Sequence, residues 1–206
     1  MSKIVATGYG RFAFEKADKQ ISEISCHAKG IFHLVPTART IIDIGGQDAK
    51  AIRLDARGAV SQFFMNDKCA AGTGRFLDVM ARVLEINIDE MADYDSRATE
   101  VVSVSSTCTV FAESEVISHL SNGVSKENII AGVHASVASK ACGLAYRTGL
   151  ENDVVMGGGV AQNAGVVKAI SRELKRPVIV APNPQITGAL GAALFAYDEA
   201  KKSNTK

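Results

Sequence analysis

The order of strand-like and helical segments is the feature that most limits how this chain can fold. Strand-like runs at 40–44, 50–55 and 59–66 are separated by turn signals at 45–48 and 56–58, which predicts an antiparallel meander. Helices and short strands alternate after the meander. Because helices that alternate with strands cover the faces of a sheet, this order predicts an α/β fold in which a mixed sheet is flanked by helices.

The remaining elements follow from hydrophobic periodicity and from the positions of glycine and proline. Residues 1–40 are expected to hold a short strand, a glycine turn at 8–10 and a mostly helical stretch at 19–27. Beyond the meander, helices are expected at 76–86, 110–120, 128–150, 160–174 and 186–200, and strands at 101–105, 153–156 and 177–180.

Composition excludes several classes of protein. Of the 206 residues, 47% are hydrophobic and 22% are charged, which is typical of a globular chain. A net charge of +1 creates no global field that favours nucleic acid or anionic lipid, and no apolar run approaches the roughly 20 residues of a membrane helix. The four cysteines lie far apart, without the spacing of a secreted disulfide framework. We therefore expect a cytoplasmic protein that binds neither nucleic acid nor membrane.

Two cysteines lie where a glycine- or serine-rich turn runs into a predicted helix. Cys69 belongs to the segment 66–76 and Cys108 to the segment 105–111. Free N–H groups and the helix dipole stabilise a thiolate at such a position, and the same geometry suits an anionic metal–sulfur cluster. Two thiolates do not complete a tetrathiolate site, and buried cysteine is also a common packing residue. By these criteria Cys26 and Cys142 are packing residues, and His27, His33, His119 and His134 are structural or solvent-facing.

Two glycine-rich turns follow predicted strands. The first places Asp43 inside an apolar strand ahead of Gly45 and Gly46, where glycine admits an oxyanion and the carboxylate can hold a hydrated Mg²⁺. A tight hairpin with an inward-facing acid explains this pattern equally well. The second turn, at 157–159, resembles a nucleotide-binding strand-to-helix turn, but it has neither a Walker A ending nor a G-x-G-x-x-G spacing.

Taken together, six blocks of the sequence resemble one known family. The chain is similar to the ATP-dependent activators of 2-hydroxyacyl-CoA dehydratases and to the related ATPase subunits of benzoyl-CoA reductase, the BadF-BadG-BcrA-BcrD ATPase family. The resemblance covers nearly the whole chain, and its blocks are Ala6–Arg11, Asp43–Asp48, Asn66–Phe76, Ser105–Phe111 with Glu113–Glu115, Gly157–Asn163 and Gly188–Ala193.

The resemblance implies a fold, cofactors and partners. The family belongs to the superfamily of acetate kinase, actin and heat-shock chaperones, whose two ribonuclease-H-like domains hold ATP and Mg²⁺ between them. Its members are homodimers that share one [4Fe–4S] cluster, which implies that Cys69 and Cys108 of each chain are the ligands. ATP hydrolysis drives the transfer of one electron to a 2-hydroxyacyl-CoA dehydratase, and ferredoxin or flavodoxin is the implied electron donor.

The resemblance also assigns the nucleotide contacts. Asp43 and Gln47 are implied to be catalytic, and together with Gly45 and Gly46 they form the second phosphate motif. The implied adenosine contacts are Gly157, Gly158, Gly159 and Gln162, and Gln185 is implied as a further nucleotide contact.

The chain departs from the family pattern at its start. The family begins with a strand that carries an acidic-x-Gly-Ser phosphate motif, whereas this sequence starts at the Ala-Thr-Gly-Tyr-Gly-Arg block. We therefore expect that the chain is a truncated product or that its start was placed too late. Residues 1–40 are then expected to be the remnant of a first ribonuclease-H-like domain, residues 41–200 the second domain and residues 201–206 a polar tail. On this expectation, both cysteine motifs of the cluster site are present, whereas the ATP site lacks the first of its two phosphate motifs.

Three alternatives stay open at this point. The chain could be an ATPase subunit of a benzoyl-CoA reductase-type system, which these residues do not separate from a dehydratase activator. It could instead be a sugar-kinase-like or chaperone-like nucleotide-binding domain with incidental cysteines. A third alternative is a remnant that dimerises around a cluster without hydrolysing ATP.

Overall fold

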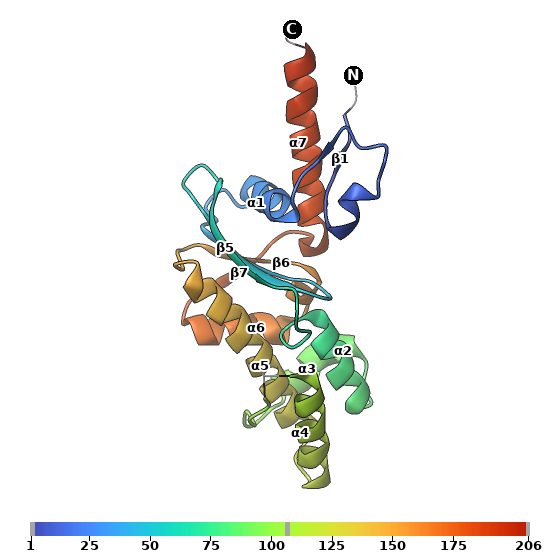
Figure 1. Cartoon of the computed structure of the whole chain (residues 1–206). Coiled ribbons are helices and arrows are strands. Elements are labelled where there is room, and N and C mark those ends of the chain that lie inside the picture. Colours follow the sequence, from blue (N-terminus) through green and yellow to red (C-terminus); the bar gives the residue numbers. More distant parts are fainter. Residues whose placement is uncertain (1–2, 106–107, 205–206) are drawn as a thin grey trace.

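A five-stranded mixed sheet lies at the centre of the protein (Figure 1), as seen in a computed structural model that describes residues 3–105 and 108–204. Its strand order is β5-β4-β3-β6-β7. The first three strands form the predicted antiparallel meander, and β6 and β7 add to it in parallel. The strands are β3 (Thr40–Ile44), β4 (Ala49–Leu54), β5 (Val60–Asn66), β6 (Val154–Gly157) and β7 (Val178–Val180).

Strand β3 is the central strand, and all five of its residues are buried because helices cover both faces of the sheet. Its register brings separate parts of the sequence together. Asp43 lies opposite Lys50 of β4 on one side and opposite Gly157 of β6 on the other. The carboxyl end of β3 is therefore where the two predicted glycine turns meet.

Helices form a layer on each face of the sheet (Figure 1). The helix α1 (Glu23–Leu34) packs with α7 (Thr187–Asn204) on one face, and its apolar residues join a small core with β3, β4 and β6. The other face carries a larger core, to which Phe76, Met80, Ile129 and Val133 contribute. The helices of this second layer are α2 (Gly74–Val83), α3 (Met91–Ser96), α4 (Thr109–Ser121), α5 (Lys126–Arg147) and α6 (Ala164–Leu174).

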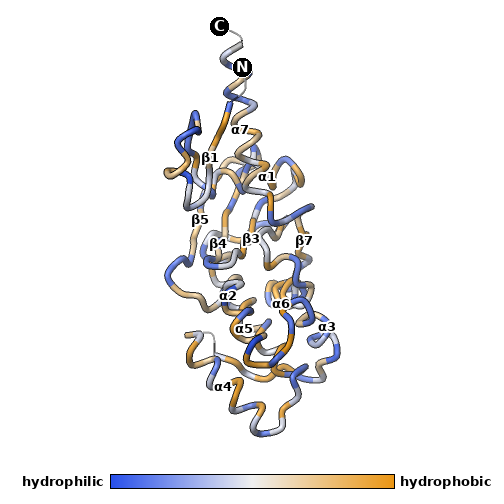
Figure 2. The backbone as a smooth tube through the Cα atoms, turned by 90° about the vertical axis from the view of Figure 1, so that its right-hand side faces the viewer, coloured by the Kyte–Doolittle hydropathy of each residue, from blue (hydrophilic) through white to orange (hydrophobic). Residues whose placement is uncertain are grey.

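The long helix α5 runs through the larger core, and Figure 2 shows hydrophobic residues concentrated in α5 and α6 below the sheet. Among the described residues α5 is the one helix whose length and hydropathy would allow a membrane span, which the sequence had not suggested. Of its most apolar 18-residue window, 67% is buried inside the protein. Packing against the sheet therefore accounts for the apolar character of this helix.

Two close helix contacts explain the glycines of α1 and α7. A Cβ on Gly30 would overlap the carbonyl oxygen of Thr187, and a Cβ on Gly191 would overlap that of Cys26. The helices therefore approach each other backbone to backbone. The short parallel pair β1 (Val5–Ala6) and β2 (Lys19–Gln20) lies beside α7 (Figure 1).

Several expected elements differ from those observed. The strand expected at 101–105 is absent, because this segment runs over α5 at Gly132, where a Cβ would overlap the carbonyl of Val102. The helix expected at 160–174 is divided by Asn163 into the 3₁₀ turn η3 (Gly159–Gln162) and α6. The expected helical stretch at 19–27 begins only at Glu23, and α3 was not expected at all. The division of the chain at residue 40 stays a prediction, although α1 packs on the sheet of the expected second domain.

Candidate functional site

Two adjoining cavities lie at the carboxyl ends of β3 and β6. The first, of about 460 Å³, is lined by the side-chain amides of Gln162, Asn163 and Gln185, and we call it the amide cavity. The second, of about 450 Å³, is lined by three carboxylates, and we call it the acidic cavity. The two cavities share four lining residues, Gly45, Gly46, Gly159 and Gln185. Nearly all the nucleotide contacts implied by the resemblance therefore lie around one continuous space.

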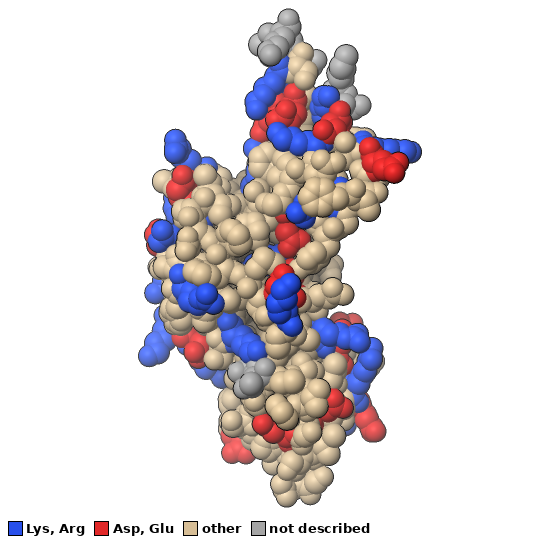
Figure 3. Space-filling view, in the orientation of Figure 1, with Lys and Arg blue, Asp and Glu red and all other residues tan. Residues whose placement is uncertain are grey.

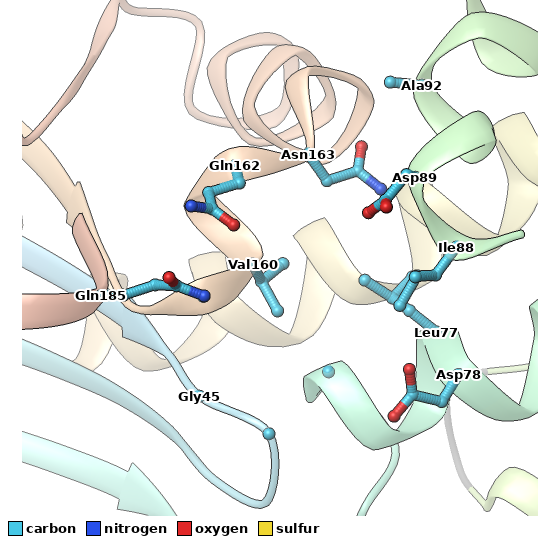
Figure 4. Close-up of a pocket in the computed structure, with 13 residues that line it drawn as sticks. Gly45, Leu77, Asp78, Ile88, Asp89, Ala92, Val160, Gln162, Asn163 and Gln185 are labelled. Atoms are coloured by element: carbon cyan, nitrogen blue, oxygen red, sulfur yellow. The ribbon is translucent and has the colours of Figure 1, made fainter. Parts of the chain in front are cut away.

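Figure 4 shows the amide cavity between two walls. Val160, Gln162 and Asn163 form one wall with Gln185, and Leu77 lies on the opposite wall. The opposite wall also carries the side chains of Asp78, Ile88 and Asp89. The apolar side chains of Val160, Leu77 and Ile88, with amides at one side of the cavity, suit a flat ring that also offers hydrogen-bonding groups.

Glycine is required where β6 turns into η3. Gly158 has φ +80°, and a Cβ there would overlap the backbone of Ile44. The neighbouring Gly157 would place a Cβ 3.1 Å from Asp43 Oδ1. Glycine at these positions lets the β6 turn approach the end of β3.

The acidic cavity contains a lysine surrounded by carboxylates. Lys50 Nζ lies 2.8 Å from Asp48 Oδ2, 3.0 Å from Glu23 Oε1 and 3.2 Å from Asp43 Oδ2. Burial would lower the pKa of Lys50, but the carboxylates outweigh it, and the pKa lies well above its ordinary value. Among the described residues, Asp43 Oδ1 is buried without a hydrogen-bond partner. A carboxylate oxygen without a hydrogen-bond partner, in a cavity of this size, fits a hydrated Mg²⁺.

Two aromatic side chains complete this cavity, and the sequence had singled out neither for function. Tyr9 Oη donates to Asp48 Oδ2 at 3.0 Å, and desolvation together with this carboxylate raises the pKa of Tyr9. His27 Nδ1 lies 2.9 Å from Thr187 Oγ1 and 3.5 Å from Asp43 Oδ1. The sequence carries a signal for two side chains of the acidic cavity, because Glu23 and His27 are four residues apart and share one face of α1.

Gln47 connects the acidic cavity with the first cysteine. It also lines a surface cavity of about 500 Å³ with Lys68, Cys69 and Arg75, among others. Two backbone hydrogen bonds strengthen this connection, since the N–H groups of Gly74 and Arg75 donate to the carbonyls of Gly45 and Gly46, each at 2.8 Å. The first turn of α2 is therefore bonded directly to Gly45 and Gly46, the glycine loop that lines both cavities.

The cysteine segments lie on neighbouring helices, since α2 packs against α4. Cys108 is the N-cap of α4, as expected. Cys69 lies four residues ahead of Thr73, the N-cap of α2, so it belongs to the preceding loop rather than to the helix end. Both thiols are partly exposed. Ser106 and Thr107 of the second cysteine motif lie outside the described residues.

The segment that leads to Cys108 is held by two side chains of α4. The carboxylate of Glu115 accepts from the N–H of Ser105 at 2.6 Å, and His119 Nε2 donates to the carbonyl of Ser103 at 3.0 Å. Within residues 3–105 and 108–204 no group of three or more His, Cys, Asp or Glu side chains could hold a metal ion. Cys69 and Cys108 can therefore supply at most half of a tetrathiolate site.

A buried histidine ties three helices together behind the amide cavity. The Asn163 side-chain oxygen accepts from the N–H of Val166, so its amide nitrogen donates to His134 Nε2 at 3.2 Å. His134 Nε2 is therefore the accepting nitrogen of this hydrogen bond, and Nδ1 faces Asp95 Oδ2 at 3.5 Å. His134 is fully buried, so the alternative that it faces solvent was wrong. It joins α5 to α3 and to the start of α6.

Known proteins resemble this chain along nearly its whole length. An activator of lactoyl-CoA dehydratase from Anaerotignum propionicum is 76% identical over 202 residues, 98% of this chain and 78% of the relative. The structure of an activator of the 2-hydroxyisocaproyl-CoA dehydratase from Clostridium difficile with bound ADPNP matches with a TM-score of 0.95 at 57% identity, covering 98% of this chain and 76% of that one.

A second solved structure agrees with the first. Component A of the (R)-2-hydroxyglutaryl-CoA dehydratase from Acidaminococcus fermentans matches with a TM-score of 0.92 at 56% identity, covering 96% of this chain and 76% of that one. The predicted α/β fold with a mixed sheet is thus confirmed. Residues 1–196 match the BadF/BadG/BcrA/BcrD ATPase family, and the chain belongs to that family.

Proposed function

We propose that this protein is an ATP-driven iron–sulfur activator that passes single electrons to a 2-hydroxyacyl-CoA dehydratase. Its identity of 76% to an activator of lactoyl-CoA dehydratase supports this function. The observation that carries the proposal is the pair of hydrogen bonds between the glycine loop and α2. These bonds join a cavity of nucleotide size to the loop of Cys69, as coupling between ATP and a cluster would require.

The nucleotide would occupy both cavities. The amide cavity suits the nucleoside, with Gln162 and Gln185 as hydrogen-bonding side chains. The backbone around the shared glycines would approach the phosphates, and Asp43 would hold the hydrated Mg²⁺ through its free oxygen. Gln47, which borders the acidic cavity, would orient the attacking water. Binding of ADPNP by the Clostridium difficile relative supports this assignment.

Cys69 and Cys108 would hold half of a [4Fe–4S] cluster, and a second copy of the chain would hold the other half. The partly exposed position of both thiols is compatible with sharing a cluster between subunits. Such a cluster supplies one-electron transfer at a potential set by hydrogen bonds and solvent exposure. The proposal places the homodimer in the cytoplasm, with ferredoxin or flavodoxin as the electron donor and the dehydratase as the acceptor.

The chain's own contribution to coupling would be mechanical. A change at the phosphates would displace the carbonyls of Gly45 and Gly46, and their hydrogen bonds would carry that displacement to Gly74 and Arg75 at the start of α2. Because α2 packs on α4, the two cysteine segments would change their relative position. Small shifts at a ligand are amplified in this way when packed elements have two alternative arrangements.

Anaerobic iron–sulfide reconstitution tests this function. We expect a brown dimer with about four irons per two chains. Substitution Cys69→Ser or Cys108→Ser should abolish iron binding, whereas Cys142→Ser should retain it, because Cys142 is buried in the core and burial raises the pKa of its thiol to about 12. A colourless wild-type protein after reconstitution would contradict the proposal and favour the cluster-free nucleotide-binding alternative.

The benzoyl-CoA reductase alternative needs a different measurement. The reconstituted dimer, with ATP and a reduced electron donor, should switch on a purified 2-hydroxyacyl-CoA dehydratase. Activation of benzoyl-CoA reduction in place of dehydration would favour the alternative. A dimer that contains iron and hydrolyses no ATP would identify the non-catalytic remnant.

A further inference from the structure

The acidic cavity contains a cationic side chain to which the sequence assigned no function. Lys50 is only 3% exposed, and its ammonium contacts the carboxylates of Glu23, Asp43 and Asp48. Among the described residues that line the acidic cavity, it is the one lysine or arginine. A buried ammonium is strongly disfavoured unless nearby charges and hydrogen bonds compensate it, so this arrangement holds Lys50 charged inside the cavity.

The charges of this cluster do not balance. Three carboxylates face one ammonium, which leaves an excess of two negative charges while His27 is neutral. A polyphosphate that entered such a cavity alone would be repelled. A divalent cation that enters with the phosphates removes the excess, and the free Oδ1 of Asp43, whose side chain is 3% exposed, is available to it or to its water shell.

Entry of the cation would also change the surroundings of Lys50. An aspartate that turns toward a divalent cation releases one of the ammonium's three donors, and the released N–H needs a new acceptor. Lys50 lines only the acidic cavity, whereas the glycines that admit the phosphates line both cavities. The far end of a polyphosphate whose nucleoside occupies the amide cavity would therefore meet Lys50.

We propose that Lys50 binds the terminal phosphate of ATP and makes the site distinguish ATP from ADP. This inference rests on the proposed function and assigns the residue that senses the triphosphate. In the nucleotide-free protein the carboxylates hold the ammonium in place. In the loaded protein the same ammonium donates to the γ-phosphate, which ADP lacks, by a charge-assisted hydrogen bond.

The affinities for ADPNP and ADP in the presence of Mg²⁺, measured by calorimetry, test this assignment. In Lys50→Met we expect ADPNP to bind about 10- to 100-fold more weakly, as the loss of a charged hydrogen bond predicts, while ADP affinity changes less than about threefold. Lys29→Met is the matched control, because Lys29 pairs with Asp198 and lines neither nucleotide cavity. Its ratio of ADPNP to ADP affinity should equal that of the wild type.

Removal of Lys50 alone leaves the buried carboxylates of Asp43 and Asp48 and the partly buried one of Glu23 without this counter-ion, which can prevent folding. The double variant Glu23→Gln/Lys50→Met removes one of these negative charges and should show the same selective loss of ADPNP. Circular dichroism and thermal unfolding of each variant verify that it is folded. An unchanged ratio of ADPNP to ADP affinity in the folded double variant, or an equal loss of both nucleotides, would overturn the assignment.

The wild-type measurement separates this inference from the function on which it rests. If the wild type binds ADPNP and the variants keep its selectivity, the role of Lys50 is refuted and the activator function is untouched. If the wild type binds neither nucleotide, both proposals fail.

Discussion

Gly158 shows how one residue limits the geometry of the whole site. Its φ of +80° and the backbone of Ile44 leave no space for a side chain. We expect Gly158→Ala to lower the free energy of unfolding by about 2 kcal/mol or more, measured by urea denaturation, because the strain and the overlap act together.

The matched control for this substitution is Gly143, which is exposed on α5. Its φ is not positive, and among the described residues no neighbouring atom lies within 4 Å of the position that a Cβ would take. Gly143→Ala should raise the unfolding free energy by about 0.5–1 kcal/mol through helix propensity. A Gly158→Ala protein as stable as the wild type would show that the β6 turn can relax.

The functional residues differ in how visible they are in the sequence. Asp43, Gly45 and Gly158 belong to short motifs whose local geometry implies a use, and the structure brings them to one place. Lys50 and Glu23 carry no such motif, although Lys50 lies only two residues beyond a recognised block. Their role depends on the pairing register of β4 and on the packing of α1, which a single sequence pattern does not encode.

At the scale of elements, the Asp95–His134–Asn163 contacts join α3, α5 and α6 behind the amide cavity. The contact with His134, ahead of the opposing effect of burial, lowers the pKa of Asp95 below its usual value. A carboxyl group with a lowered folded-state pKa adds stability above its unfolded pKa of about 3.9, and this stability is lost as the pH falls through the lowered pKa.

Substitution Asp95→Asn should therefore cost about 1 kcal/mol of unfolding free energy at pH 7. The difference from the wild type should shrink as the pH falls below the unfolded pKa of about 3.9, where the unfolded chain binds a proton first, and should vanish below the lowered pKa of the folded state. Urea denaturation at several pH values measures both effects. Asp93→Asn, an exposed neighbour on α3, is the control; a difference for Asp95→Asn that stays constant with pH would contradict this account.

The expected elements were correct where local pattern alone decides the structure. The meander at β3, β4 and β5 follows from alternating apolar runs and turn residues, so it was predicted almost to the residue. The segment 101–105 has the composition of a strand, yet it packs over Gly132 and is held by Glu115 and His119 of α4. Its conformation depends on tertiary contacts, which override β-propensity.

At the scale of the molecule, the end formed by α4 is the surface that we expect a second copy to cover if the proposed homodimer forms. Val110, Phe111 and Ile117 of α4 are exposed although apolar. Figure 3 shows few charged side chains at this end of the molecule. Exposed apolar residues next to Cys108, a partly exposed cysteine, are typical of an interface that closes around a shared ligand.

We expect Phe111→Asp to make the reconstituted protein monomeric and to lower its iron content, because a charge buried at an apolar interface is strongly unfavourable. Size-exclusion chromatography and iron analysis measure the two effects. Phe12→Asp is the control, since Phe12 is similarly exposed, at 73% against 64%, but lies in the N-terminal segment beside α7 rather than on α4. A Phe111→Asp protein that stays dimeric with full iron would exclude this face as the interface.

The sequence by itself determined the α/β class, the meander, the family and the positions of the glycine and cysteine motifs. The turns, strands and motifs depend on spacing over a few residues, where turn chemistry and side-chain alternation decide the backbone, and the class and the family follow from the order of these features along the chain. Only the tertiary structure decided that Lys50 is enclosed by carboxylates from α1, β3 and the following turn, and that the glycine loop is bonded to the start of α2. These contacts join residues distant in the chain, and burial and strand register alone bring them within hydrogen-bonding distance.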